Sequence, residues 1–320
     1  MARDILVWDQ HCCVPLDGSG DPRGLARCLA AGVDCVSLNV GYAPQSLEDS
    51  LSLLEQFRES LGCDDRFLLA RSVSDVDKAR RAGQLAVIFD LEDANPLGGD
   101  PGRVVDFYDL GVRTLALTYN GRNEAGHGCL DDPEGGLTAF GVEVVAEMNR
   151  VGMVVDGSHC SLRTSLDLMV ASADPVIFSH SSCRAVWEHE RNVSDDQIRA
   201  CAESGGVIGI CGVGIFLGEN DTSTEALVRH IDHAVQLVGP DHVGLGSDFT
   251  FDLADLQREL EENPHLFPDS YTRWGPIDFV PPERLMELPE RLSALGYSPS
   301  EVEGIKGGGN FRRVAAQVWR

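Results

Sequence analysis

The stretch Leu85-Ala86-Val87-Ile88-Phe89-Asp90-Leu91-Glu92 is a nearly continuous apolar run that ends on acidic residues. Such runs are typical of β-strands that are covered on both faces, as in parallel sheets. Seven further runs predict strands at 5–9, 35–40, 114–118, 153–156, 176–178, 207–210 and 243–246. Helix-like segments lie between the strands, at 46–61, 74–82, 141–150, 161–171, 194–204 and 224–237. Eight strands with interleaved helices predict a single α/β barrel of the TIM type, (β/α)8.

Two of the helices carry start signals. Ser46 is a candidate N-cap for the first of them. Ser74, with Asp77 three residues later, comes close to a capping box for the second. We therefore expect the second helix to begin at Ser74.

The whole chain, 1–320, is expected to form one domain. Of its 320 residues 43% are hydrophobic, enough for a sizeable core, and no linker divides it. Gly- and Pro-rich stretches at 97–101 and 121–136 follow strand ends, so we expect long loops on the active face of the barrel. An insertion at 253–282, rich in aromatic residues and proline, is expected to be either a lid or an interface.

The chain is strongly acidic, with 26 Lys and Arg against 51 Asp and Glu and a formal net charge of −25. Because such a field repels phosphates, we expect neither nucleic acid nor anionic membrane surfaces as partners. No apolar run approaches the ~20 residues that span a bilayer, and no secretory signal pattern opens the chain. The ten Cys are scattered, as expected for free thiols. These features predict a cytoplasmic protein.

Five residues with metal-binding side chains each close an apolar run, and they are His11, Glu92, His159, His180 and Asp248. Side chains at the C-terminal ends of barrel strands converge on one face. Imidazole and carboxylate are ligands of Zn²⁺-like metals, and a carboxylate near a metal-activated water can act as general acid and base. The pattern therefore predicts a metal-dependent active site. Taken singly, each residue also fits a structural role at a strand end or in a loop.

The segment around His11 contains two cysteines. Residues two apart in an extended segment point to one side, so His11 and Cys13 could reach one metal while Cys12 points away. The alternative is a histidine and two cysteines packed at the barrel rim.

Two other positions also leave alternatives open. Glu92 could bridge two cations, but its neighbours Asp90 and Asp93 compete for this role. Arg191, on a loop after the His180 strand, could hold a substrate carboxylate in a bidentate pair. Taken alone, Arg191 fits a surface ion pair better.

Together these residues lie in motifs that resemble the membrane dipeptidase (renal dipeptidase) family of zinc metallopeptidases, within the amidohydrolase-like barrels. The motifs run collinearly through nearly the whole chain: Trp8-Asp9-Gln10-His11, Asp90-Leu91-Glu92, Leu117-Thr118-Tyr119-Asn120-Gly121-Arg122-Asn123, Gly136-Leu137-Thr138-Ala139-Phe140-Gly141, Glu147-Met148-Asn149-Arg150-Val151-Gly152-Met153, Asp156-Gly157-Ser158-His159, Phe178-Ser179-His180-Ser181, Arg191-Asn192-Val193-Ser194-Asp195-Asp196, Gly244-Leu245-Gly246-Ser247-Asp248-Phe249 and Gly308-Gly309-Asn310-Phe311-Arg312. The resemblance implies a (β/α)8 barrel with a binuclear zinc site. It also implies hydrolysis of dipeptides, often with a D-residue at the C-terminal side.

The resemblance also implies a role for each candidate residue. Glu92 bridges two metals, His11 binds the first, and His159 and His180 complete the second site. Asp248 acts on the water as general acid and base, and Arg191 holds the carboxylate of the dipeptide.

The chain departs from the family pattern at two positions. The first motif of the family is His-x-Asp, and here the Asp position holds Cys13. This thiol either ligates the first metal or leaves that site weak or empty, so we expect one or two Zn²⁺ per chain. A family histidine that polarises the scissile carbonyl is matched by Tyr119, whose hydroxyl can also donate to an oxyanion.

Three functional hypotheses follow. The leading one is a metallo-dipeptidase that uses a metal-activated water on small dipeptide-like substrates, with a homodimer left open as a further partner. The second is a related amidohydrolase that acts on a non-peptide amide or a lactone. The third is a non-catalytic barrel with a defective first metal site, which Cys13 alone supports.

Overall fold

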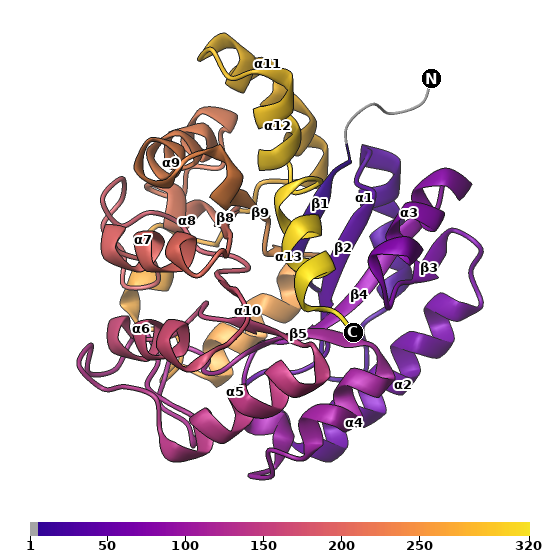
Figure 1. Ribbon diagram of the computed structural model, residues 1–320, viewed down its shortest axis with the longest axis vertical. Helices are drawn as coiled ribbons and strands as arrows, with labels where there is room; N and C mark the ends of the chain where they lie inside the picture. The colour runs from indigo at the N-terminus through magenta and orange to yellow at the C-terminus, as the bar shows by residue number, and fades with distance from the viewer. Residues whose placement is uncertain (1–5) are drawn as a thin grey trace.

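A ring of parallel strands with helices around it forms the centre of the computed structural model, which describes residues 6–320 (Figure 1). The eight strands of the ring are β1 (Trp8–Cys13), β2 (Cys35–Asn39), β4 (Leu85–Leu91), β5 (Val112–Ala116), β6 (Val154–Asp156), β7 (Val176–Ile177), β8 (Ile208–Cys211) and β9 (Val243–Gly246). They are ordered β7-β6-β5-β4-β2-β1-β9-β8. A parallel bridge between Phe178 and Ile208 joins the two ends of this order. The predicted barrel is confirmed.

The seam between β7 and β8 allows an unusually close approach of backbones. A Cβ atom added at Gly209 would lie 2.1 Å from the Ser179 carbonyl oxygen, and one added at Gly246 would lie 1.9 Å from it. Only a residue without a side chain fits at either position. The segment that carries Ser179 and His180 is therefore held directly against β8 and β9.

The first strand differs from its prediction. The sequence indicated a strand at 5–9, of which residue 5 lies outside the described part, whereas β1 runs from Trp8 to Cys13. His11 and Cys13 therefore lie within the strand rather than after it. The polar residues Gln10 and His11 are buried inside the barrel, so the change from apolar to polar residues marks the active face and not the strand end.

Two short strands were not predicted, β3 (Phe67–Leu69) and β10 (Phe249–Thr250). The first pairs with β4 and the second with β1, outside the ring order. Runs of two or three residues carry too little periodicity to be recognised in a sequence.

Helices surround the ring: α1 (Ala26–Ala31), α2 (Leu47–Gly62), α3 (Val73–Ala82), α4 (Arg103–Leu110), α5 (Ala139–Val151), α6 (Leu162–Ala171), α7 (Asp195–Glu203), α8 (Gly214–Leu217), α9 (Thr224–Val238), α10 (Leu253–Glu262), α11 (Leu288–Ala294), α12 (Pro299–Ile305) and α13 (Asn310–Val318). Ser46 is the N-cap of α2, as predicted, and it also forms a capping box with Asp49. The cap of α3 is Ser72, paired with Asp75, and not Ser74. Two Ser-x-x-Asp pairs overlap in this stretch, so spacing alone cannot choose between them.

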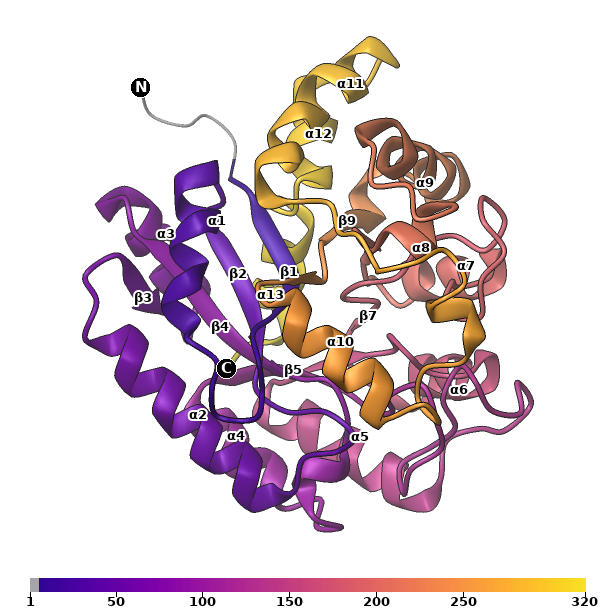
Figure 2. The ribbon, with the colours of Figure 1, turned by 180° about the vertical axis from the view of Figure 1, so that it is seen from behind.

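The insertion at 253–282 begins with α10, which crosses in front of the ring in the view of Figure 2. Its apolar residues belong to a small cluster of their own, which joins the end of β8 and the segment after it: Cys211, Val213, Ile215, Phe216, Leu260, Leu266, Phe267, Tyr271 and Ile277. Within residues 6–320, none of the helices combines the length and apolar character needed to cross a membrane.

Candidate metal centre

Four of the predicted site residues meet at the open end of the ring. His11 comes from β1, Glu92 follows β4, His180 follows β7 and Asp248 follows β9. One ligand atom from each lies within 4.8 Å of the others. The positions are far apart in the sequence and are brought together because the strands are parallel and end on the same face.

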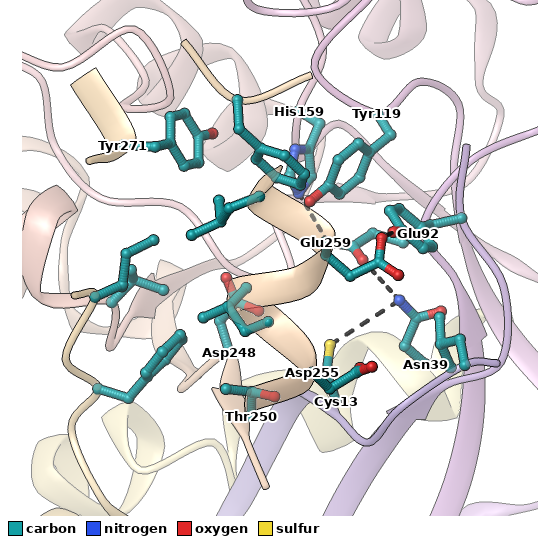
Figure 3. A pocket seen from close by; sticks show the side chains of 18 of the residues that line it. Cys13, Asn39, Glu92, Tyr119, His159, Asp248, Thr250, Asp255, Glu259 and Tyr271 are labelled. Carbon is teal, nitrogen blue, oxygen red and sulfur yellow. Dashed lines mark hydrogen bonds and ion pairs between the residues drawn. The ribbon is translucent and has the colours of Figure 1, made fainter. Parts of the chain in front are cut away.

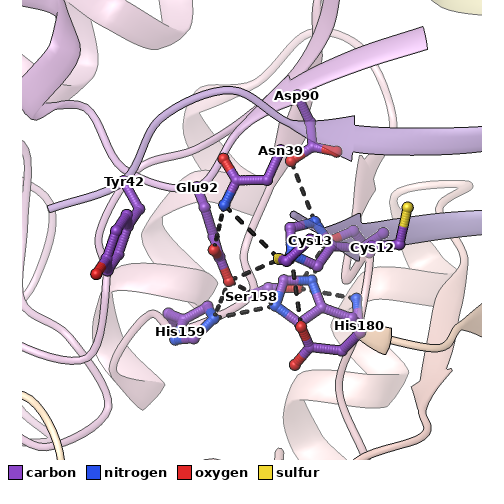
Figure 4. Close-up of polar contacts among 12 residues, drawn as sticks. Cys12, Cys13, Asn39, Tyr42, Asp90, Glu92, Ser158, His159 and His180 are labelled. Carbon is purple, nitrogen blue, oxygen red and sulfur yellow. Dashed lines mark hydrogen bonds and ion pairs between the residues drawn. The ribbon is translucent and has the colours of Figure 1, made fainter. Parts of the chain in front are cut away.

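Glu92 Oε1 is the common point of this group. It lies 2.8 Å from His159 Nε2, 3.1 Å from His180 Nε2 and 3.4 Å from His11 Nε2. The other oxygen of the carboxylate accepts a hydrogen bond from Asn39 Nδ2 at 2.6 Å. Figure 4 shows the imidazoles of His159 and His180 on either side of this carboxylate. Glu92, rather than Asp90 or Asp93, therefore lies at the centre of the group.

The two neighbouring carboxylates, Asp90 and Asp93, have other roles. Asp90 lies two residues earlier, on the same face of β4, and its Oδ1 is 3.1 Å from His11 Nδ1. Asp93 accepts hydrogen bonds from the Asn95 backbone and the Asn123 side chain, which makes it a loop-stabilising residue.

Each of the three imidazoles has a partner on the nitrogen that faces away from Glu92. Asp90 lies at His11 Nδ1, as above, and Asn120 Oδ1 lies 2.8 Å from His159 Nδ1. Ser179 Oγ lies 2.7 Å from His180 Nδ1, while its own proton goes to Asp156. All three partners act as acceptors, so in the neutral imidazoles the proton sits on Nδ1 and the Nε2 lone pair points to the centre.

This donor set fits a metal ion. Three imidazole Nε2 atoms face one carboxylate oxygen, each 2.8 to 3.4 Å from Glu92 Oε1. Imidazole nitrogen and carboxylate oxygen are the ligands of catalytic zinc sites, and hydrogen bonds to the outer nitrogen are the usual means of fixing such ligands. His11, Glu92, His159 and His180 would hold the ion.

The pKa values of the three histidines also favour metal binding at this centre. Burial lowers the pKa of His159 to about 3 and the pKa of His180 well below its ordinary value, which keeps both in the metal-binding form. Burial also disfavours charge on His11, but Asp90, Glu92 and Cys13 outweigh it and raise the pKa of His11 well above its usual range. In the metal-free protein, protonated His11 therefore carries a positive charge beside Glu92. A metal ion bound at this position would supply that charge instead, and the proton on His11 would be released.

Asp248 is held in a tight turn after β9. Its backbone N–H donates to the His11 carbonyl at 2.9 Å, and the preceding residue, Ser247, donates from its N–H to buried Asp9 at 2.6 Å. Its φ of 55° is rare for a residue other than glycine. Burial raises the pKa of Asp248 to about 7, which suits a proton-transferring group at neutral pH.

Cys13 lies beside His11, as the spacing predicted. Its Sγ is 3.4 Å from His11 Nε2 and faces the cavity, whereas Cys12 Sγ points away and donates to the Ser37 carbonyl. Burial raises the pKa of the Cys13 thiol to about 12. The thiol is therefore protonated at neutral pH unless a cation stabilises the thiolate.

A cavity opens above the metal centre, between the strand ends and the insertion. Cys13, Glu92, His159 and Asp248 form part of its floor and wall, and residues of α10 close the opposite side, as Figure 3 shows. Tyr119 also lines it. Its ring stacks on His159 at 4.3 Å between centroids, and burial raises its pKa well above the ordinary value, so that it stays a hydrogen-bond donor.

Arg191 is buried behind His180 rather than in the wall of the cavity. Its Nη2 donates to the His180 carbonyl at 2.8 Å and its Nη1 to Ser181 Oγ at 3.0 Å. Its Nε is buried and has no hydrogen-bond partner among the described residues. The surface ion pair that the sequence suggested for Arg191 taken alone is thus excluded, because the residue is buried. Two of its three nitrogens already bond the His180 carbonyl and the Ser181 hydroxyl.

Sequence reasoning missed several supporting residues, namely Asn39, Asn120, Asp156 and Ser179. Asn39 is the polar last residue of a buried strand, a signal that could have been used. Asp156 is likewise the acidic last residue of β6. Asn120 lies in a loop and gave no comparable signal.

Replacing Asp90 by asparagine tests the outer contact of His11. The amide keeps the shape of the side chain but loses the charge that favours the Nδ1 proton, so we expect Zn²⁺ to bind roughly 10- to 100-fold more weakly. Competition with a chromophoric chelator measures the affinity. Asp106→Asn, which alters an exposed residue paired with Arg103, serves as control. Unchanged affinity in Asp90→Asn would contradict the role of this contact.

Comparison with known proteins agrees with the resemblance drawn from the motifs. The family model of membrane dipeptidases, peptidase family M19, matches residues 25–265. This stretch includes Glu92, His159, His180 and Asp248, and it begins after His11 and Cys13.

Individual relatives extend the match. Dipeptidase verJ of Clonostachys rogersoniana is 36% identical over 207 residues, which are 64% of this chain and 52% of that protein, so the chain spans about half the length of this relative. An uncharacterized protein in the pqqA 5′ region of Klebsiella pneumoniae is 33% identical over 80% of this chain and 90% of its own. The crystal structure of an amidohydrolase from Pseudomonas aeruginosa superposes with a TM-score of 0.88, at 27% identity, over 99% of this chain and 97% of that one. The chain belongs to the membrane dipeptidase family.

Proposed function

We propose that this protein is a metal-dependent dipeptidase whose substrates include dipeptides with a D-residue at the C-terminal side. One observation carries the proposal: three imidazole Nε2 atoms converge on Glu92 Oε1 beneath an open cavity, in a chain of the membrane dipeptidase family. A bound divalent cation supplies Lewis acidity there, which polarises a carbonyl and lowers the pKa of water to roughly 7.

Each residue of the centre then has a distinct task. Glu92 would be shared between the two zinc ions of a binuclear site, with His11 holding the first ion and His159 and His180 the second. Asp248 takes a proton from the attacking water and delivers it to the leaving amine, a role supported by its raised pKa and its place in the cavity wall. Tyr119 donates its hydroxyl to the developing oxyanion.

Cys13 completes the first metal position as a thiolate. Its contact with His11 Nε2 supports this assignment. A thiolate donates more charge than a carboxylate, so the first ion is a weaker Lewis acid than its partner.

Arg191 attracts the substrate carboxylate through its charge rather than through the bidentate pair that the sequence suggested, because it lies behind His180 and two of its nitrogens are already bonded. Its unpartnered Nε and its charge, which acts on Asp248, support this role.

The experiment is a hydrolysis assay of the Zn²⁺-loaded protein on L-X-D-X and L-X-L-X dipeptides, with lactones and N-acyl amino acids alongside. Release of free amino acids from dipeptides is expected. The variant His180→Ala should have a lower activity than the wild type. The loss should exceed the roughly 10- to 100-fold expected when only a hydrogen-bond partner of a metal ligand is removed. Equal turnover by the two proteins would refute the proposal. Turnover of lactones or N-acyl amino acids alone would favour the non-peptide amidohydrolase. No hydrolysis, with less than one metal per chain, would favour the non-catalytic barrel.

A further inference from the structure

Asn120 is fully buried and touches both the metal centre and the insertion. Its Oδ1 is the acceptor at His159 Nδ1, 2.8 Å away. Its Nδ2 donates to the Leu266 carbonyl at 2.9 Å and to the hydroxyl of Tyr271 at 3.1 Å. Every polar atom of this amide is therefore engaged, one with a candidate metal ligand and one with the segment 253–282.

The backbone at Asn120 is held in an uncommon conformation, with φ of 52°. Asparagine is among the few residues that adopt this region at low cost. His159 itself has φ of 63°. Such positions persist only where surrounding contacts hold them, and they concentrate at functional sites. Backbone bonds within the neighbouring loop hold this pair, from the Leu130 N–H to the Asn120 carbonyl at 2.9 Å and from the Cys129 N–H to the His159 carbonyl at 2.7 Å, and the insertion adds the contacts to the Asn120 side chain.

A second route joins the insertion to the same histidine. Phe267 packs edge-on against Tyr119, with ring centroids 6.2 Å apart, and Tyr119 stacks on His159 at 4.3 Å. Tyr271 packs edge-on against Phe267 in turn, at 5.5 Å. The insertion thus contacts His159 through one polar chain and one aromatic chain.

The insertion has limited support of its own. Most of its buried apolar residues form the small cluster with the end of β8, and only Val280, near its far end, belongs to one of the larger clusters around the barrel. The bridge between Val213 and Phe279 anchors its far end. A segment with few core contacts opens at a lower free energy than the whole domain.

We propose that Asn120 is a positioning residue that couples the segment 253–282 to the metal centre, so that closure of this segment over the cavity and metal binding by His159 stabilise each other. The inference rests on the proposed function for the assignment of His159 as a metal ligand. Linkage requires the coupling to be reciprocal: the factor by which Zn²⁺ favours the closed segment equals the factor by which closure tightens Zn²⁺.

Two variants test the coupling. Tyr271→Phe removes one hydroxyl and keeps the ring in its aromatic cluster. Asn120→Asp keeps an acceptor for His159 and for the Tyr271 hydroxyl and tolerates the backbone conformation, but it loses the N–H group that bonds the Leu266 carbonyl and turns a carboxylate oxygen toward that carbonyl. The control is Tyr297→Phe, which removes the hydroxyl that bonds Asp232 on α9, outside the metal centre. Amide hydrogen exchange of residues 253–282 is measured with and without Zn²⁺, and Zn²⁺ affinity by chelator competition.

In the wild type and in Tyr297→Phe, Zn²⁺ should slow exchange across 253–282. Tyr271→Phe should bind Zn²⁺ about 2- to 10-fold more weakly, which is the effect of one hydrogen bond. The factor by which Zn²⁺ slows amide exchange across 253–282 should fall by the same amount. Asn120→Asp should lose most of this protection even at saturating Zn²⁺. Protection that is the same in all four proteins would overturn the coupling and leave the proposed function intact. A wild type that binds no Zn²⁺ would overturn both.

Discussion

Replacing Glu92 by glutamine is expected to lower kcat/KM for dipeptides by about 10³-fold or more and to reduce the zinc content of the protein. The carboxylate oxygen that faces His11, His159 and His180 is the shared atom of the centre. Glutamine keeps the size of the side chain but removes its negative charge, which attracts the ions, and it can turn an N–H group toward three lone pairs. An electrostatic stabiliser in such a site is worth about 10²- to 10³-fold on its own, and loss of metal returns water to its high ordinary pKa.

Metal content by mass spectrometry and steady-state kinetics measure the two parts of this prediction. Glu225→Gln is a matched control, because this exposed glutamate pairs only with Arg291 at 3.4 Å among the described ion pairs. A Glu92→Gln protein with full zinc content and wild-type turnover would show that Glu92 is not the bridging group.

Replacing Asp248 by asparagine should leave zinc content intact and lower kcat by roughly 10²- to 10⁴-fold, the range for loss of a general acid and base. The amide can occupy the same turn, since the Asp248 backbone N–H, not its side chain, makes the bond to the His11 carbonyl. The KM should change little, because the proton is moved only in the reaction step. A kcat within a factor of a few of the wild type would exclude Asp248 as the proton-transferring group.

The pH dependence of the stability of the protein tests whether the Asp248 carboxyl has the raised pKa that this role requires. Burial raises the pKa of Asp248 to about 7 in the folded metal-free protein, against roughly 3.9 when unfolded. The charged form is therefore disfavoured by folding, and stability is lost as pH rises from about 4 through 7. Metal-free Asp248→Asn should thus melt at a higher temperature than metal-free wild type above pH 7, and the two should converge toward pH 4. Parallel melting curves at every pH would contradict the raised pKa.

The barrel could be read from the sequence because its strands are nearly continuous apolar runs, and the central residues because each closes or lies next to such a run. The same logic failed at β1, where polar residues inside the strand serve the active face and hide its true extent. It also failed at Asn120. The family motif around Asn120 marks the segment but not the role of this side chain, since its partners Leu266 and Tyr271 lie far along the chain. Contacts made only in the folded state have no local pattern.

Gly209 on β8 and Gly246 on β9 restrict which substitutions the backbone next to the metal centre can accept. Gly209 and Gly246 touch neither the cavity nor a ligand atom, yet a single methyl group at either would collide with the carbonyl of Ser179, the residue before His180. The loops and the insertion can vary around the cavity, whereas the two glycine positions against the Ser179 carbonyl have no room for a side chain. New substrate preferences in this fold are therefore expected to arise on the insertion side of the cavity, while the seam stays as it is.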